Sequence, residues 1–199
     1  MKLEIQREHL LKPLQQVIGV VERRQTLPIL SNVLFAARDG ELTLTATDLE
    51  VEISARSSLE IAEPGETTLP ARKLLDILRA LPDGVIVSLV IEGDKALLRS
   101  GRSRFSLITL PATDLPTLDD LSFDGQIRVP QGFLKSLIEY THFAMAQQDV
   151  RYYLNGLLMD ITEEQIRAVA TDGHRLALYE VEVKSDSPIV RQLIVPLSI

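Results

Sequence analysis

The triplet Ala46-Thr47-Asp48 occurs again as Ala170-Thr171-Asp172, about 124 positions further along the chain. Two earlier segments recur at nearly the same distance and in the same order: Leu11-Lys12 as Leu134-Lys135, and Asn32-Val33-Leu34 as Asn155-Gly156-Leu157-Leu158. Solenoid repeats have periods of roughly 20–50 residues, so a period this long indicates a duplicated domain. The fold is therefore decided by a unit that is used more than once.

A shorter repeat lies inside the longer one. Leu69-Pro70-Ala71, Val129-Pro130-Gln131 and Val195-Pro196-Leu197 each place a proline between an apolar run typical of a strand and a predicted helix. Proline suits the start of a helix, because the N–H that it lacks would have no partner there. Only three residues follow Pro196, so we expect that the second domain in this sequence lacks its second helix and its closing strands.

Each unit, about 60 residues long, predicts a strand, a helix and three further strands. The first unit has strands at 2–6, 33–37, 42–47 and 51–56, and a helix at 8–20 in which Pro13 predicts a kink or a late start. The second has strands at 66–69, 85–91, 96–100 and 104–110 and a helix at 71–81. The third has strands near 122–129, 156–161, 166–171 and 176–183 and a helix at 131–146, and a last strand covers 189–195. The run 111–116 breaks the pattern as a linker does, so we predict an α+β fold with two domains, 1–120 and 121–199.

The composition is that of a soluble globular chain, with 199 residues, 45% of them hydrophobic, and no cysteine. No apolar stretch reaches the roughly 20 residues of a membrane span, and the N-terminus lacks the apolar stretch of a signal peptide, so we expect a cytoplasmic protein. The net charge of −7 argues against nucleic acid, yet residues 7–24 and 71–81 each carry a net charge of +2. Ordinary solvated helix faces would explain this as well as a surface for an anionic partner.

The sequence shows no constellation typical of an active site. His9, His142 and His174 are scattered without metal-ligand spacing, and no glycine-rich phosphate loop precedes a helix. Asp48 and Asp172 end predicted strands, where an aspartate usually bonds the backbone of its own turn. We therefore expect no enzyme activity, no metal and no cofactor.

Two loops carry more information. In Gln147-Gln148-Asp149-Val150-Arg151-Tyr152-Tyr153 the tyrosines could stack on bases while Arg151 contacts phosphate, although paired tyrosines equally mark a strand entry that packs one ring inward. In Thr171-Asp172-Gly173-His174-Arg175-Leu176 a glycine-centred turn presents His and Arg beside Leu154 and Leu176, and a plain hairpin is the alternative.

Five separated segments, in order, closely resemble the bacterial DNA polymerase III β subunit family, the sliding clamps, over the whole chain. They are Met1-Lys2-Leu3 with Arg7 to Leu14, Thr26 to Leu30, Ser100 to Phe105, Asp149 to Gly156, and Ala170 to Leu176. The resemblance implies the DNA clamp fold, in which helices line a ring around duplex DNA and sheets lie outside. It implies a non-enzymatic processivity factor that closes as a head-to-tail homodimer of three-domain subunits. This chain matches the first domain and part of the second.

The resemblance also implies site residues and partners. For sequence-independent contact with DNA it points to Arg24, Gln148, Tyr152 and Tyr153. Gln147 departs from the His of some relatives. For one wall of a pocket that receives short linear motifs from the DNA polymerase III α subunit, the clamp loader and other clamp-binding proteins, it points to Leu154, Thr171, Gly173, His174, Arg175 and Leu176. For the subunit interface it points to Lys73, Lys95, Arg102, Arg104, Phe105 and Leu107, whose basic and apolar character suits an acidic, apolar partner surface. Lys95 departs from the Arg of some relatives.

The other pocket wall and the partner face belong to the family's third domain. We therefore expect that this chain alone cannot close a ring. The alternative is an interaction module that binds a full-length clamp and blocks its dimerisation.

Overall fold

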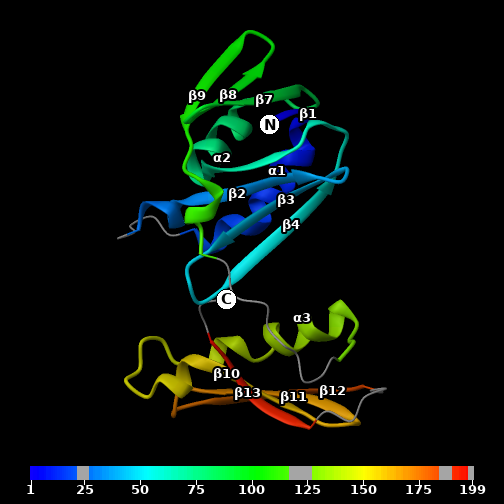
Figure 1. The fold of residues 1–199 in the computed structure, drawn as a ribbon. Helices are drawn as coiled ribbons and strands as arrows, with labels where there is room; N and C mark the ends of the chain where they lie inside the picture. Colours follow the sequence, from blue (N-terminus) through cyan, green and yellow to red (C-terminus); the bar gives the residue numbers. More distant parts are fainter. Residues whose placement is uncertain (22–26, 117–126, 184–189, 197–199) are drawn as a thin grey trace. The chain divides into compact units, whose positions relative to one another are not determined.

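The computed structural model describes residues 1–21, 27–116, 127–183 and 190–196 (Figure 1). The chain forms two compact units, Met1–Asp120 and Leu121–Ile199, and each is described by itself. In the described residues no helix is long and apolar enough to cross a bilayer.

Unit 1 (Met1–Asp120) contains two antiparallel sheets. The five-stranded sheet has the order β5-β1-β7-β8-β9 and the four-stranded sheet the order β4-β3-β2-β6. The strands are β1 Lys2–Gln6, β2 Asn32–Arg38, β3 Glu41–Thr47, β4 Glu52–Ser58, β5 Ile61–Glu63, β6 Gly65–Pro70, β7 Ile86–Glu92, β8 Lys95–Ser100 and β9 Ser103–Ile108. The short β5 is the one strand of this unit that the sequence pattern did not predict.

In unit 1 the first strand of each repeat pairs with a strand of the other repeat. β1 lies against β7, with Leu3 opposite Leu89, and β6 lies against β2, with Leu69 opposite Val33. These four residues are buried, so the exchange ties the two repeats into one core. Periodicity predicts the strands but not this exchange, because pairing partners are far apart in the sequence.

The helices α1 (Arg7–Val17) and α2 (Ala71–Ala80) lie between the two sheets (Figure 1). Leu10 and Leu14 of α1 and Leu74 and Leu78 of α2 are buried in the shared core, at the helical spacing that the sequence indicates. α1 begins at Arg7 with Pro13 inside it, so the predicted late start was wrong, and a 3₁₀ turn (Ile18–Val20) replaces its last predicted turn.

Arg7 is not part of a solvated basic face. Its side chain is buried and bonds the C-terminal end of α2, with Nε donating to the Leu78 carbonyl at 2.5 Å and Nη1 donating to Glu8 at 3.0 Å and to Asp83 at 2.5 Å. The Gly84 N–H and the Arg7 guanidinium lower the pKa of Glu8. The charge that the sequence places on the first helix is thus partly neutralised inside the protein.

The predicted linker also takes part in unit 1. Residues 112–114 form a 3₁₀ turn, and Leu115 is buried with Ile29 and Leu30. The buried Thr68 hydroxyl accepts from Asn32 and donates to the Leu110 carbonyl, both at 2.9 Å. The start of this segment is therefore fixed to the four-stranded sheet.

Unit 2 (Leu121–Ile199) has one described sheet, of order β12-β11-β10-β13, with α3 on one face (Figure 1). Its elements are α3 Gln131–Glu139, β10 Gly156–Ile161, β11 Gln165–Thr171, β12 Leu176–Glu182 and β13 Arg191–Pro196. β13 pairs with β10 as β6 pairs with β2 in unit 1, which is the same repeat relation.

Two predictions for unit 2 were wrong. The helix predicted to reach residue 146 ends at Glu139, because the buried Thr141 hydroxyl bonds the Leu137 carbonyl and its backbone leaves the helical region. The strand predicted near 122–129 is absent over residues 127–129, and its earlier part lies outside the described residues.

Candidate ligand pocket and basic face

The loop before β10 is closed by its own backbone and by one amide side chain. The Ala146 N–H donates to the Leu154 carbonyl at 2.9 Å. Asn155 accepts from the Asp149 N–H at 3.0 Å and donates to the Asp149 carbonyl at 2.9 Å, so it fixes both ends of the segment. Gln148 has a φ of 57°, a left-handed conformation that non-glycine residues rarely adopt.

Asp149 fixes Arg151 within this loop. One carboxylate oxygen accepts from the Arg151 N–H at 2.8 Å and from Nε at 3.0 Å, and the other accepts from Nη2 at 2.9 Å. The Arg151 side chain and N–H lower the pKa of Asp149 to about 2, and Asp149 raises the pKa of Arg151. The carboxylate stays ionised at neutral pH, and Arg151 is oriented while Nη1 keeps its donors for another group.

In the turn between β11 and β12, an aspartate again bonds both the backbone and an arginine side chain. One Asp172 oxygen accepts from the His174 N–H at 2.9 Å and the Arg175 N–H at 3.0 Å, and the other accepts from Arg175 Nε at 2.9 Å. These bonds, the backbone ones first, lower the pKa of Asp172. Gly173 has a φ of +87°, which suits glycine. The expectation that Asp172 bonds its own turn is confirmed.

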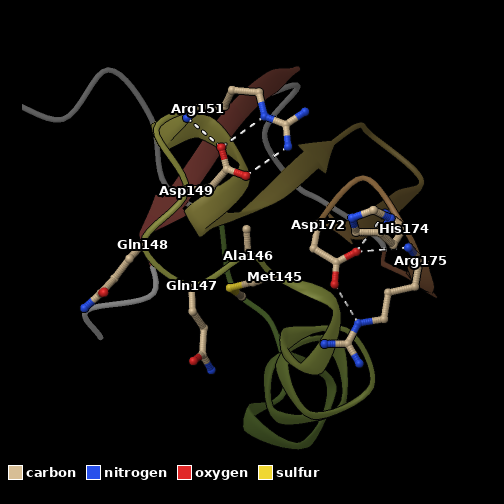
Figure 2. A pocket seen from close by; sticks show the side chains of 9 residues that line it. All are labelled: Met145, Ala146, Gln147, Gln148, Asp149, Arg151, Asp172, His174 and Arg175. Carbon is tan, nitrogen blue, oxygen red and sulfur yellow. Dashed lines mark hydrogen bonds and ion pairs between the residues drawn. The ribbon is translucent and has the colours of Figure 1, made fainter.

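The two loops line an open pocket of about 470 Å³. Figure 2 shows Asp149 with Arg151 and Asp172 with Arg175 on opposite sides, with Met145 and Ala146 between them. A Cβ on Gly173 would lie 3.6 Å from Arg151 Nη2, so this guanidinium passes over the opposite turn. The Arg175 guanidinium lies 5.7 Å from the centre of the Phe143 ring. Each wall thus carries one ion pair, Arg151 with Asp149 and Arg175 with Asp172, and the floor is apolar.

The structure places the predicted residues in different positions. His174 and Arg175 line this pocket together with Gln148, which the sequence assigned to a different surface. Leu154, Thr171, Gly173 and Leu176 lie beside it and are not part of its lining. Sequence reasoning did not assign Met145, Asp149 or Phe143 to the site; the Asp-x-Arg spacing of 149–151 was the available signal for Asp149.

The tyrosines of the same loop face solvent. Tyr152 is 82% exposed and Tyr153 51% exposed, and their rings meet edge to face with centroids 6.0 Å apart. The alternative that one ring packs into the core is therefore wrong. Arg24 lies outside the described residues.

The predicted interface residues of unit 1 gather mainly on the β8–β9 hairpin. Lys95, Arg102 and Arg104 are exposed there, Phe105 is half-buried against the core, and Lys73 is exposed on α2. Leu107 is buried, and its side chain packs in the hydrophobic core of unit 1. β9 is the edge of its sheet, since β8 is its one neighbour in the sheet order.

Comparison with known families decides the class of this protein. The model of the DNA polymerase III beta subunit N-terminal domain matches residues 1–119, and that of its central domain matches residues 128–199. This chain belongs to the DNA polymerase III beta subunit family. The fold of the family, with mixed helices and antiparallel sheets, is the fold described above.

Named relatives agree with the family match. The chain is 54% identical to the beta sliding clamp of Escherichia coli K12 over 94% of this chain and 52% of the relative. It is also 54% identical to that of Pseudomonas aeruginosa PAO1, over 98% of this chain and 54% of the relative. The chain thus spans about half the length of the curated relatives that it matches.

Solved structures of the family superpose well on the chain. The DnaN sliding clamp of P. aeruginosa bound to griselimycin has a TM-score of 0.94 at 53% identity, covering 99% of this chain and 54% of that one. The beta sliding clamp of C. crescentus has a TM-score of 0.93 at 45% identity, covering 99% of this chain and 54% of that one.

Proposed function

We propose that this chain supplies part of a DNA sliding clamp, a non-catalytic cytoplasmic processivity factor that encircles duplex DNA and tethers the replicative polymerase. The family match over nearly all of the chain carries this proposal. A closed ring keeps the polymerase on its template by topology, so the DNA contacts can be weak and independent of sequence.

The proposed DNA contacts are Arg24, Gln148, Tyr152 and Tyr153. The high exposure of Tyr152 and Tyr153 supports stacking on the bases of single-stranded template, which is tolerant of sequence. Phosphate contacts by arginine weaken as salt rises, because binding releases counterions. Such contacts allow a ring to slide.

The proposed partners of the pocket are short linear motifs of the DNA polymerase III α subunit, the clamp loader and other clamp-binding proteins. The residues proposed for this site are Leu154, Thr171, Gly173, His174, Arg175 and Leu176. Of these, His174 and Arg175 line the pocket together with Gln148 and Arg151. The oriented guanidiniums can donate to main-chain carbonyls of a peptide, while Met145 in the lining can receive an apolar side chain. Leu154 and Leu176, which lie beside the pocket, can extend this apolar contact.

Griselimycin is a suitable probe, because the P. aeruginosa clamp binds it. We expect that titration of the isotope-labelled chain shifts backbone NMR resonances of residues 145–151 and 171–176 and leaves those of β3 and β4 unchanged. The full-length P. aeruginosa clamp is the positive control. If that clamp binds and the chain shows no shifts at millimolar concentration, the pocket proposal is wrong.

A second candidate function is capture of a full-length clamp through the β8–β9 face. The open edge of β9 and its exposed cations favour it, because they suit the acidic, apolar surface of a head-to-tail partner subunit. Co-elution of the chain with full-length P. aeruginosa clamp at micromolar concentration, after overnight subunit exchange, is the expected result. Separate elution would exclude this function.

A further inference from the structure

One side of α3 exposes apolar side chains. Phe133, Leu134 and Ile138 are 42%, 38% and 43% exposed, whereas Leu137 is fully buried in the core of unit 2. Residues four apart lie on the same side of a helix, so Leu134 and Ile138 form a stripe beside the buried side. A surface helix of a globular protein normally directs its apolar residues into a core. The stripe is therefore packing surface that the described residues leave partly open.

The matching positions of unit 1 are buried. A proline immediately precedes both α2 and α3, and counted from that proline Leu74 and Leu78 of α2 correspond to Leu134 and Ile138 of α3. The two leucines of α2 are fully buried, in a core that α2 shares with α1, a helix that it contacts. In unit 1 the two repeats thus bury these positions together.

The two repeats of unit 1 are related reciprocally. β1, the first strand of the first repeat, pairs with β7 of the second, and β6, the first strand of the second repeat, pairs with β2 of the first. Reciprocal contacts, in which each partner uses the same surface, are those of an isologous two-fold interface. Unit 1 is thus built as a dimer of repeats within one chain, and the apolar side of one repeat fits that of another.

A single copy of unit 2 already has the sheet that such a dimer needs. β13 pairs with β10 as β6 pairs with β2, so the order β12-β11-β10-β13 matches the order β4-β3-β2-β6 of unit 1 strand for strand. Residues 127–129, which precede α3 as β1 precedes α1, form no strand. The described sheet therefore needs no strand from a partner, and the open surface belongs to the helix layer.

The charges beside the stripe suit an antiparallel pair of helices. Lys135 and Glu139 lie one turn apart on α3, with Nζ and Oε1 3.6 Å apart, and both side chains are exposed. A two-fold axis that runs across two α3 helices places the same flank of each helix side by side, in opposite directions. Lys135 of each copy then lies beside Glu139 of the other, so the surface is complementary to itself in charge as well as in its apolar character.

We propose that the Leu134–Ile138 side of α3 is a self-association surface, and that a second copy of this chain packs its own α3 antiparallel against it. The two helices then lie between two four-stranded sheets, as α1 and α2 lie between the sheets of unit 1. The occupant is a second copy because the equivalent side in unit 1 is buried with a repeat of the same kind. This surface goes beyond the proposed function and does not depend on DNA or on a clamp partner.

Sedimentation equilibrium of the whole 199-residue chain tests this surface. The mean mass should rise from 22.2 kDa toward twice that value between about 2 and 200 µM, a range suited to a small interface. Ile138→Glu buries a charge in the contact and should raise the dissociation constant at least about 10-fold. The matched control is Ile108→Glu, an exposed isoleucine on β9 of unit 1, which should leave the dissociation constant within about twofold of wild type.

A pair of charge reversals tests the antiparallel arrangement. Lys135→Glu and Glu139→Lys should each weaken self-association, because each variant brings like charges together across the two-fold axis. An equimolar mixture of the two variants pairs opposite charges again, so it should associate about 3- to 10-fold more tightly than either variant alone. Charges that act only within their own helix would not be rescued by mixing.

Each other outcome overturns the proposal. A chain that stays monomeric over this range of concentration has no self-association surface on α3. A dimer that is lost with Ile108→Glu and kept with Ile138→Glu is formed through unit 1. Growth beyond the dimer is not the closed, isologous contact proposed. If circular dichroism shows that Ile138→Glu is unfolded, the mixing experiment decides, and the absence of rescue there contradicts the contact.

Discussion

The Ala-Thr-Asp turn occurs once in each unit, with nearly the same bonds. In unit 1 the Thr47 hydroxyl accepts from the Leu49 N–H at 3.0 Å, and Asp48 accepts from the Glu50 and Val51 N–H groups at 3.0 and 2.8 Å. In unit 2 Thr171 and Asp172 bond Gly173, His174 and Arg175 in the same way. The residue that follows the aspartate has a left-handed backbone conformation in both turns, with a φ of 80° at Leu49 and +87° at Gly173.

The two turns differ in the side chains that they present. The turn of unit 1 presents Leu49 and Glu50, whereas the turn of unit 2 presents His174 and Arg175, with Arg175 bonded to Asp172 and lying over Phe143. The loop 145–151 then completes a pocket beside the second turn. The two turns thus share the same hydrogen bonds. Only the turn of unit 2 forms part of a pocket, because it carries Arg175 and lies beside the loop 145–151.

The largest expected effect concerns the pairing of β10 with β13 in unit 2, which repeats the pairing of β2 with β6 in unit 1. Gly156 begins β10 opposite Pro196, as Asn32 begins β2 opposite Pro70. A Cβ on Gly156 would lie 2.5 Å from Ile194 Cγ2 and 2.8 Å from the Val195 carbonyl oxygen of β13. Gly156→Ala should therefore destabilise unit 2 by about 1–3 kcal/mol. All four tyrosines lie in unit 2 and the chain has no tryptophan, so urea unfolding followed by tyrosine fluorescence reports on this unit.

Gly132→Ala is the control for that substitution. Gly132 lies in α3 with nothing within 4 Å of an added Cβ, so the change should stabilise unit 2 by about 0.5–1 kcal/mol. Equal unfolding midpoints for the two variants would contradict the close approach of β10 and β13.

The next effect separates the two turns by function. Asp172→Asn removes an ionised acceptor of the Arg175 guanidinium, so the affinity for griselimycin should fall about 5- to 20-fold, because charged hydrogen bonds are the stronger ones. Asp48→Asn makes the matched change in unit 1 and should leave the affinity unchanged. Isothermal titration calorimetry measures both, and equal losses would mean that the effect is not local to the pocket.

A smaller effect should appear at low pH. Asp149 has its pKa lowered from 3.8 to about 2, so its ionised form is favoured in the folded state. The stability that it contributes is present above pH 3.8 and is lost as the pH falls toward 2. Thermal unfolding between pH 4.5 and 2, followed by tyrosine fluorescence, should show a smaller fall in stability for Asp149→Asn than for wild type. Parallel curves would contradict a stabilising ion pair between Asp149 and Arg151.

The smallest effect concerns the left-handed residue of the first turn. Leu49→Gly relieves a conformation that leucine rarely adopts but adds freedom to the unfolded chain, so unit 1 should gain only about 0.5 kcal/mol. Gly173→Ala should change unit 2 in the opposite direction. Circular dichroism in urea measures the first and tyrosine fluorescence the second, and a destabilised Leu49→Gly would show that the half-exposed leucine packs usefully.

Much of this molecule follows from local sequence. Alternating apolar residues located every described strand except β5, and the Pro-led helix starts at Ala71 and Gln131 are confirmed. The role of Asp172 was readable from its place after a strand. The end of α3 could not be predicted in this way, because it depends on the buried hydroxyl of Thr141, and the periodicity of a sequence does not show which hydroxyls are buried.

The candidate site was readable in part. His174 and Arg175 were predicted beside a pocket, and Gln148 was assigned to DNA contact, but the sequence treated these as separate surfaces. Arg7 was counted as free basic charge, although its side chain is buried and donates to the Leu78 carbonyl and to Asp83. Both differences arise from contacts between residues that are distant along the chain.

The sequence by itself determined the repeat, the strand and helix types and the turn chemistry, because these depend on interactions within a few residues. Only the tertiary structure decided that β1 and β6 exchange sheets and that two loops join around one pocket. Those arrangements depend on which buried surfaces fit together, and this is a property of the packed chain rather than of any segment.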